Sequence, residues 1–183
     1  KYFNNINISG ERLLLLLNDL LDLAKLESGT LELSIKPASL NNLLHACKTE
    51  LEAKLFDHQL ELEINLPLLD ITALCDEPRL KQVIINLLSN AIKFSPVKSK
   101  IEIKVIIKEN NSLQVKVQDQ GVGLTKERLE LVFNKFVQDD SAETGTGMGS
   151  TGLGLTISQE IIKAHGGDIW AELPYIDEDS QAW

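Results

Sequence analysis

Asp76-Glu-Pro-Arg-Leu-Lys-Gln-Val-Ile-Ile-Asn-Leu-Leu-Ser-Asn-Ala-Ile-Lys-Phe-Ser95 is the stretch that decides the fold, and its pattern predicts one amphipathic helix. Asp76 is a suitable N-cap, and Pro78 falls in the first turn, where its missing N–H costs nothing. Apolar residues recur every three or four positions and form one broad face, made of Leu80, Val83, Ile84, Leu87, Leu88, Ala91 and Ile92. This face predicts that the helix packs on the core of a domain.

A strip of amide side chains runs beside that apolar face. Gln82, Asn86 and Asn90 follow one another at a spacing of four residues, and Lys93 continues the strip. A solvated helix face usually carries Glu, Lys and Arg, whereas asparagine is a poor helix former. Amide groups are suited to coordinating an ion or holding a phosphate. The strip is therefore a candidate binding site, and the alternative is an ordinary polar face that happens to be rich in amides.

The composition narrows the class of protein. The chain has 183 residues, 43% of them hydrophobic, which suffices for one globular domain and an appendage. Its net charge of −9, without any basic run, argues against nucleic-acid binding. A nucleotide with a metal ion is still compatible, because the cation offsets acidic surroundings. Cys47 and Cys75 lack the spacing of a zinc site, so we expect packing roles in a reducing compartment.

The segment from Phe3 to Glu27 predicts a long helix with a seam of the kind that drives oligomerisation. Its seam residues are Phe3, Ile6, Gly10, Leu13, Leu17, Leu20 and Ala24. The chain offers no second helix of this length and pattern, so a symmetric dimer would supply its neighbours; packing on its own domain is the alternative. No apolar run reaches the roughly 20 residues of a membrane span. Because Lys1 rather than Met opens the chain, we expect a soluble fragment of a longer protein, whose missing part could carry an anchor.

The remaining pattern predicts an α+β fold. Alternating segments predict strands at 31–35, 59–66, 71–74, 100–108, 113–118 and 168–172, and periodic segments predict further helices at 39–56, 125–132 and 155–165. Residues 109–112 suit a hairpin turn. Together they predict two layers, with three helices on one face of a mixed, mostly antiparallel sheet.

Two glycine-rich segments interrupt this pattern. Asp119-Gln-Gly-Val-Gly-Leu124 follows a strand, and the polar segment 137–151 leads into Thr151-Gly-Leu-Gly-Leu155 at the start of a helix. A polar loop of that length is uncommon in a compact domain and is usually a lid or a binding loop. Backbone N–H groups at a helix N-terminus favour phosphate. His165, which is followed by two glycines, is interpreted as a capping residue at the end of this helix.

In this order, the motifs resemble the ATP-binding domain of sensor histidine kinases, whose superfamily includes the ATPase domains of gyrase, the Hsp90 chaperones and MutL. The segment 86–94 looks like the asparagine box, 119–123 the first glycine box, 133–136 the phenylalanine box and 152–155 the second glycine box. The segment 17–29 is similar to the second helix of the dimerisation and phosphotransfer hairpin. The resemblance implies a hairpin helix over 1–28 and a catalytic domain of the Bergerat ATP-binding fold over 29–183.

The resemblance also implies ATP and Mg²⁺ as cofactors and a role for each matching residue. Asn86 would be a magnesium ligand, while Asn90 and Lys93 would reach the phosphates, with Lys93 neutralising charge during transfer. Asp119 would accept a hydrogen bond from the adenine amine, and Phe94 would line the adenine pocket. The other nucleotide-binding residues would be Gly121, Gly123, Lys135, Thr151, Gly152, Leu153 and Gly154, with Lys135 on the phosphates when the lid closes.

Gln82 separates two activities within the superfamily. Relatives that hydrolyse ATP typically carry Glu at this position as a general base, and glutamine cannot take a proton at neutral pH. The resemblance therefore implies a cytoplasmic protein-histidine kinase of two-component signalling, dimeric through its N-terminal helix and acting on a response regulator receiver domain. A non-catalytic interaction module is the alternative, and a gyrase- or Hsp90-like ATPase is disfavoured. We expect no nucleic-acid contact and no direct membrane contact.

The chain departs from the family pattern at two places. None of His45, His58 and His165 lies in a His-Glu-Leu-Arg-Thr-Pro-like motif, so we expect this chain to bind ATP without phosphorylating itself. Glu172 is followed at once by Leu173-Pro174, where family members continue through a glycine-rich turn into a last strand. The final hairpin is therefore shortened, or residues are missing.

Overall fold

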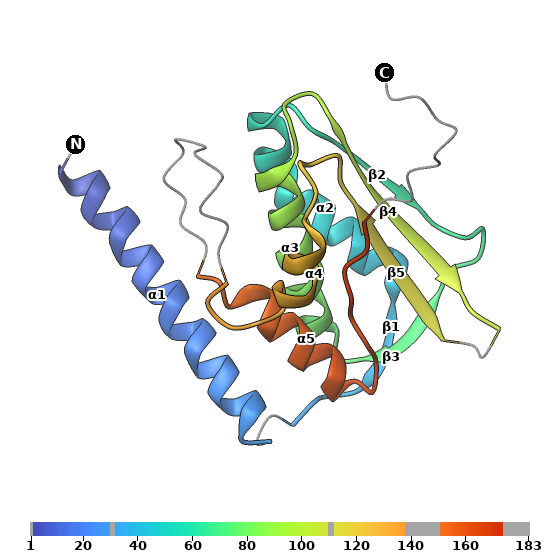
Figure 1. Cartoon of the computed structure of the whole chain (residues 1–183). Helices are drawn as coiled ribbons and strands as arrows, with labels where there is room; N and C mark the ends of the chain where they lie inside the picture. Colours follow the sequence, from blue (N-terminus) through green and yellow to red (C-terminus); the bar gives the residue numbers. More distant parts are fainter. Residues whose placement is uncertain (1, 30–31, 110–111, 138–150, 174–183) are drawn as a thin grey trace.

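Helix α3 (Glu77–Phe94) lies at the centre of the fold and has the bounds that its sequence predicts (Figure 1). Asp76 caps it, with Oδ1 accepting the Arg79 N–H at 3.2 Å. Its buried residues are those of the predicted apolar face: Val83, Ile84, Leu88, Ala91 and Ile92. One helix therefore provides both the centre of the packing and the amide strip.

The computed structural model describes residues 2–29, 32–109, 112–137 and 151–173. The other helices are α1 (Tyr2–Glu27), α2 (Leu40–Asp57), α4 (Lys126–Leu131) and α5 (Gly154–Ala164). The strands are β1 (Lys36–Ser39), β2 (Glu61–Asn65), β3 (Thr72–Cys75), β4 (Lys100–Ile107) and β5 (Leu113–Gln118). The predicted lid falls mostly on 138–150, and the end of the predicted last hairpin on 174–183, so both lie outside the described residues.

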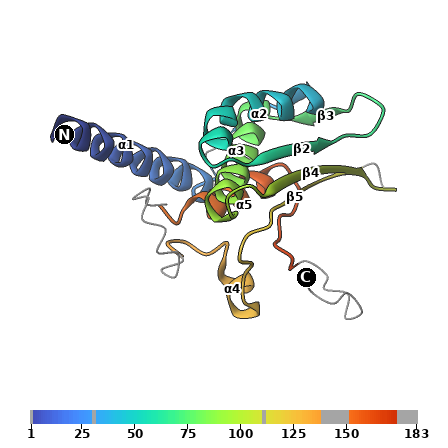
Figure 2. The same ribbon diagram turned by 90° about the horizontal axis from the view of Figure 1, so that it is seen from above.

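The strands form a mixed arrangement, as predicted. β2, β4 and β5 make one sheet, with β2 parallel and β5 antiparallel to the central β4. β1 and β3 pair antiparallel in a separate two-stranded sheet. Figure 2 shows α2 and α3 lying over one side of the strands. The α+β prediction, with helices layered on a mixed sheet, is therefore confirmed.

Two apolar clusters meet at α3. The larger cluster lies between α2, α3 and the sheet, where Leu44, Leu88 and Ile101 are fully buried. The second cluster joins α1, α3 and α5, and its buried residues are Leu23, Val83, Leu153, Ile157 and Ile161. Because neighbouring parts of the apolar face of α3 contribute to the two clusters, α3 fixes the position of α5 relative to the sheet.

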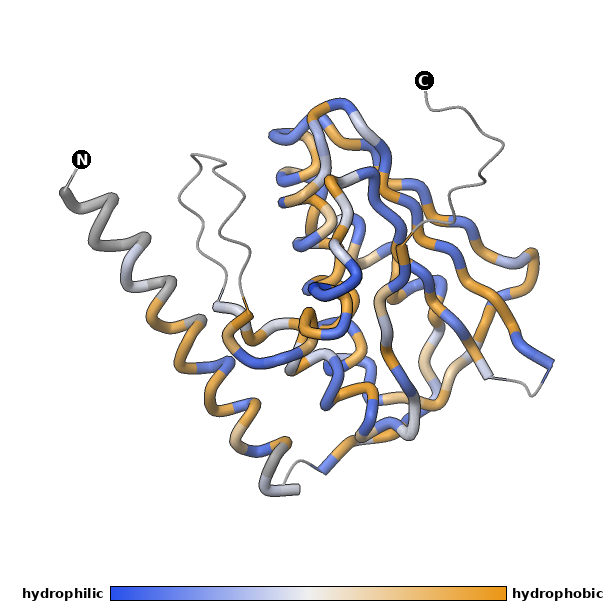
Figure 3. Tube along the Cα trace, in the orientation of Figure 1, coloured by the Kyte–Doolittle hydropathy of each residue, from blue (hydrophilic) through white to orange (hydrophobic). Residues whose placement is uncertain are grey.

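Helix α1 contacts the domain near its C-terminal end and extends away from it (Figures 1 and 2). Apolar residues nevertheless recur in the coloured part of this helix (Figure 3). Its exposed leucines are Leu13, Leu14, Leu16, Leu17, Leu20 and Leu21. Within the described ranges, no helix combines the length and the apolar character needed to cross a bilayer.

Two predicted strands are wrong. Residues 32–35 are not a strand. The strand β1 begins at Lys36 instead, and its residue Ala38 is buried and pairs with Ala73 of β3. Residues 168–173 belong to neither described sheet; the segment reaches β5 through the side chains of Lys116 and Glu172, whose Nζ and Oε2 lie 3.9 Å apart. Alternation of apolar and polar residues predicts which face a segment buries but cannot supply a partner for its backbone.

His165 joins the end of α5 to the start of α3. It is the C-cap of α5, as interpreted from the sequence. Its Nδ1 lies 2.8 Å from the Ile161 carbonyl oxygen, and its Nε2 accepts the Asp76 N–H at 3.0 Å. Burial alone would raise the pKa of Asp76, but hydrogen bonds from the backbone N–H groups of Ser34 and Arg79 lower it overall.

Candidate functional site

The amide of Asn86 lies against the first turn and a half of α5. Its Nδ2 donates to Ser158 Oγ at 2.9 Å. On the other side, a Cβ placed on Gly154 would lie 2.3 Å from Asn86 Oδ1. Only a glycine therefore lets the amide oxygen lie at the beginning of α5. The structure brings together an asparagine and a glycine that the sequence places far apart.

The N-terminus of α5 is the second part of the site. Leu153 is the N-cap, and its apolar side chain cannot accept a hydrogen bond from the first N–H groups of the helix. Thr151 Oγ1 accepts the Leu153 N–H at 3.2 Å, and Gly152 has a φ of +70°, a conformation that favours glycine. The Leu153 side chain is fully buried, so it can meet a ligand only through its backbone.

The phenylalanine segment is tied to this helix start at two points. Thr156 Oγ1 donates to the Phe133 carbonyl oxygen at 2.8 Å, and the Phe136 N–H donates to the Gly152 carbonyl oxygen at 2.9 Å. Lys135 lies between these two attachments and is exposed. The two ends of the predicted lid segment are thus held side by side at the N-terminus of α5.

The first glycine segment passes against the C-terminal end of α3. Asp119 follows β5, is exposed, and accepts the Gly121 N–H through Oδ1 at 2.7 Å. A Cβ on Gly121 would lie 2.8 Å from the Phe94 carbonyl oxygen. Lys93 Nζ lies 4.8 Å from the centroid of the Phe94 ring. Asp119, Gly121, Lys93 and Phe94 therefore form one group, and Gly123, with a φ of +71°, follows in the same segment.

The contact of Asn86 with the start of α5 and the group around Asp119 lie at the two ends of the amide strip. Asn86 and Phe94 are eight residues apart on α3, about 12 Å along a helix. The half-buried Asn90 and Lys93 lie between them. Such a strip can hold an elongated ligand with an acidic group at the α5 end and a hydrogen-bonding ring at the Asp119 end. An oxygen donor beside a helix N-terminus fits a magnesium ion carried by a phosphate, so the residues present fit that metal.

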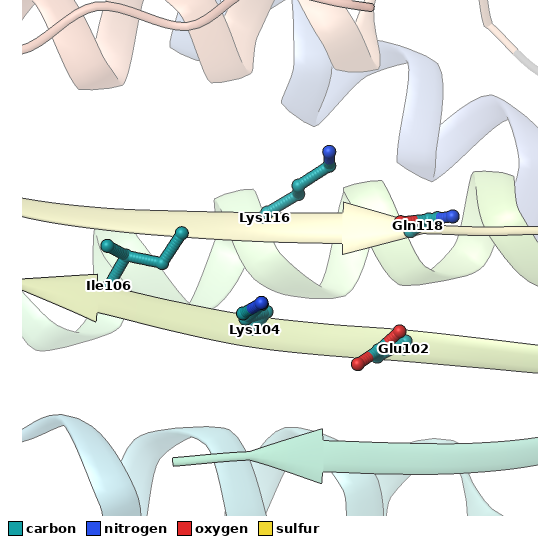
Figure 4. A pocket seen from close by; sticks show the side chains of 5 residues that line it. All are labelled: Glu102, Lys104, Ile106, Lys116 and Gln118. Atoms are coloured by element: carbon teal, nitrogen blue, oxygen red, sulfur yellow. The ribbon is translucent and has the colours of Figure 1, made fainter. Parts of the chain in front are cut away.

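A shallow pocket on the other face of the sheet does not belong to this site. Its lining residues, shown in Figure 4, are Glu102, Lys104, Ile106, Lys116 and Gln118. They come from β4 and β5 and alternate with the residues that face the helices. None of them comes from the amide strip or from a glycine segment.

Two carboxylates of α1 reach the site, and neither was among the site residues predicted from the sequence. Asp22 Oδ2 accepts hydrogen bonds from Arg79 Nη1 at 2.8 Å and Gln82 Nε2 at 2.9 Å, while Arg79 Nη1 also lies 2.9 Å from Gln82 Oε1. Asp19 Oδ2 accepts the Thr151 hydroxyl at 2.8 Å. Two acids three residues apart on a leucine-rich helix are the signal that could have indicated a docking face.

The two carboxylates have opposite pKa shifts. Burial raises the pKa of Asp22, but the hydrogen bonds from Arg79 and Gln82 outweigh it and lower the pKa overall. Burial raises the pKa of Asp19, and the hydrogen bond from Thr151 does not compensate for it. Ionised Asp22 therefore stabilises the docked α1, whereas ionisation of Asp19 weakens it.

We expect Asp22→Asn to lower the free energy of unfolding by about 1 kcal/mol at pH 7, because it removes a charged acceptor of two hydrogen bonds. Since the folded pKa is lowered, this contribution is present above about pH 4 and is lost as the pH falls through the folded pKa. Denaturant titrations of both proteins between pH 3 and pH 7 measure it. Asp19→Asn is the control of opposite sign: the wild-type protein should lose stability relative to it as the pH rises. A difference for Asp22→Asn that does not vary with pH would contradict the assignment.

Comparison with known proteins finds one family and many related chains. The profile described as "Histidine kinase-, DNA gyrase B-, and HSP90-like ATPase" matches residues 75–181, more than half of the chain. The sensor histidine kinase WalK of Bacillus subtilis (strain 168) is 33% identical over 186 residues, covering 94% of this chain and 30% of that protein. The chain thus spans less than a third of the length of this relative.

Solved structures agree with the sequence comparison. Full-length ShkA in complex with AMPPNP superposes with a TM-score of 0.77 at 28% identity, over 90% of this chain and 34% of that chain. Histidine kinase ThkA in complex with the response regulator protein TrrA gives a TM-score of 0.74 at 26% identity, over 96% of this chain and 47% of that chain. Both matches extend over nine-tenths of the chain or more.

Proposed function

The chain belongs to the histidine kinase-, DNA gyrase B- and HSP90-like ATPase family, and on that premise we propose that it binds Mg²⁺-ATP and donates the γ-phosphoryl group to a histidine of a dimerisation domain. The observation that carries the proposal is the position of the Asn86 amide oxygen beside Gly154 at the N-terminus of α5. This position combines an oxygen donor for a metal with a helix end that favours phosphate.

Different residues of the site bind different parts of the nucleotide. Asn86 offers its amide oxygen to Mg²⁺, which supplies charge neutralisation at the phosphates when bound. Asn90 and Lys93 lie next along α3 and reach the phosphates. Asp119 accepts a hydrogen bond from the adenine amine, and Phe94 lines the adenine pocket. The remaining contacts come from Gly121, Gly123, Lys135, Thr151, Gly152, Leu153 and Gly154. The spacing of about 12 Å along α3 supports this order.

Gln82 favours transfer over hydrolysis. A hydrolase needs a group near the phosphates that takes a proton from water, and a neutral amide cannot. Both polar atoms of Gln82 are also engaged, Nε2 with Asp22 and Oε1 with Arg79. This engagement supports a role in holding α1 against the domain.

The partners follow from α1 and from the structural neighbours. The exposed leucines of α1 support a homodimer formed through this helix. We assign residues 1–28 to the dimerisation hairpin and 29–183 to the catalytic domain, with Leu23 packed into the cluster of α3 and α5. A response regulator receiver domain is the proposed acceptor downstream, on the analogy of ThkA with TrrA, and a cytoplasmic location suits both partners.

Nucleotide-dependent stability tests the proposal. A ligand present at 100 times its Kd stabilises the folded state by about 2.7 kcal/mol. We expect thermal unfolding to shift upward with ATP and Mg²⁺, and less when EDTA removes the metal. The complete gene product should then form an acid-labile phosphohistidine with labelled ATP. No stabilisation would favour the non-catalytic module, and steady ATP hydrolysis by the chain would favour the gyrase-like activity.

A further inference from the structure

Ser158 is a buried polar residue to which the proposed function gives no role. It lies on α5 four residues after Gly154, on the same face of the helix, and is 1% exposed. Its Oγ accepts from Asn86 Nδ2 at 2.9 Å. A hydroxyl buried in this way needs a reason, because an apolar side chain would fill the same space without a polar atom to satisfy.

We propose that Ser158 is a positioning residue, which holds the Asn86 amide so that its oxygen faces the start of α5. This inference rests on the proposed function, because the oxygen matters there as a metal ligand. The two ends of an asparagine amide have almost the same shape but opposite hydrogen-bonding chemistry. A reversed amide would present an NH₂ group to a cation, and a mobile amide would have to be ordered at each binding event.

The surroundings of Asn86 support this role from two sides. Ser158 Oγ accepts from Nδ2, so Oδ1, at the other end of the planar amide group, is directed away from the serine hydroxyl. Gly154 leaves room for Oδ1, because a Cβ there would lie 2.3 Å from it. Without the serine acceptor, Nδ2 would lose its partner in a half-buried position and the side chain would turn toward solvent. Groups that orient a metal ligand typically contribute 10- to 100-fold to metal affinity.

The first test compares the ATP affinity of wild-type protein and Ser158→Ala, each with Mg²⁺ and with EDTA. We expect Ser158→Ala to weaken binding about tenfold with Mg²⁺ and to leave binding in EDTA nearly unchanged. Thr156→Val is the matched control, because Thr156 is the other buried hydroxyl on this part of α5 but bonds to Phe133. The ratio of the ATP affinity with Mg²⁺ to the ATP affinity in EDTA should be the same for Thr156→Val as for the wild type. Ser158→Thr, which keeps the acceptor, should restore the ratio.

The second test needs no nucleotide. The side-chain NH₂ resonances of Asn86, assigned by their loss in Asn86→Ala, should exchange slowly with water in the wild type and faster in Ser158→Ala. Unchanged resonances, or an unchanged Mg²⁺-to-EDTA ratio in a variant that unfolds at a normal temperature, would overturn the inference. A wild-type protein that does not bind ATP would instead overturn the proposed function. The NH₂ resonances of Asn86 would still report whether Ser158 holds the amide.

Discussion

Asp119→Asn is expected to lower the affinity for ATP by about 100-fold while the protein stays folded. Asp119 Oδ1 accepts the Gly121 N–H at 2.7 Å, which fixes the plane of the carboxylate and leaves Oδ2 as the acceptor for an adenine amine. An asparagine has one oxygen. If that oxygen keeps the bond to Gly121, the NH₂ group meets the adenine amine, and two donors then face each other.

Titration of ATP into both proteins, by calorimetry or with a fluorescent analogue, measures the loss. The unfolding temperature should hardly change, because Asp119 is exposed and the turn at Gly121 keeps an acceptor. Asp168→Asn removes another exposed carboxylate, beyond the far end of α5, and should bind ATP normally.

The base specificity should change in the same variant. An NH₂ group at position 119 can donate to a base that carries a carbonyl oxygen where adenine has its amine, so Asp119→Asn should prefer ITP to ATP. Normal ATP affinity in Asp119→Asn, or no change in this preference, would contradict the adenine assignment.

Local signals explain which elements could be predicted from the sequence. α3 agrees with its prediction because capping by Asp76 and the apolar period act within a few residues. β4 and β5 agree because two alternating segments that are close in sequence pair with each other antiparallel. The family resemblance, drawn from motifs of a few residues each, is confirmed by the match over 75–181. The same motifs predicted that Asn86 and Gly154 would lie at one site, and the structure brings them into contact.

The missed features depend on how distant elements dock. The contact of Arg79 with Asp22 joins residues 57 apart in the chain, and nothing local to either residue indicates it. The error at 168–172 has the same origin, because a strand needs a partner that its own pattern does not specify. Ser158 is different: its place four residues after Gly154 puts it on the glycine face of α5, so helical spacing alone could have indicated it.

The contact between α1 and the candidate site connects the proposed dimerisation helix with the proposed nucleotide site. Gln82 and Thr151 belong to the candidate site, yet their hydrogen bonds go to Asp22 and Asp19 of α1. Leu23, which directly follows Asp22 and lies four residues after Asp19, is buried against α3 and α5. A rotation of α1 would therefore have to break polar contacts with α3 and with the segment before α5 together.

Gly154→Ala is expected to reduce Mg²⁺-dependent ATP binding by about 100-fold, the upper end of the effect of disturbing the orientation of a metal ligand. The added Cβ would lie 2.3 Å from Oδ1, 2.9 Å from Cγ and 3.2 Å from Nδ2 of Asn86, so the whole amide has to move and its bond to Ser158 breaks. The fold should persist, because alanine is a better helix former than glycine by about 1 kcal/mol, which offsets part of the lost contact.

Gly10→Ala is the matched control, since a Cβ on this helical glycine of α1 meets no atom within 4 Å. It should leave ATP affinity unchanged. The double variant Asn86→Ala with Gly154→Ala separates the clash from any direct effect on the helix end. If the loss in Gly154→Ala comes through Asn86, the double variant should bind no worse than Asn86→Ala alone. Additive losses would mean that the glycine acts on the phosphates through its own backbone, and normal binding by Gly154→Ala would remove Asn86 from the metal site.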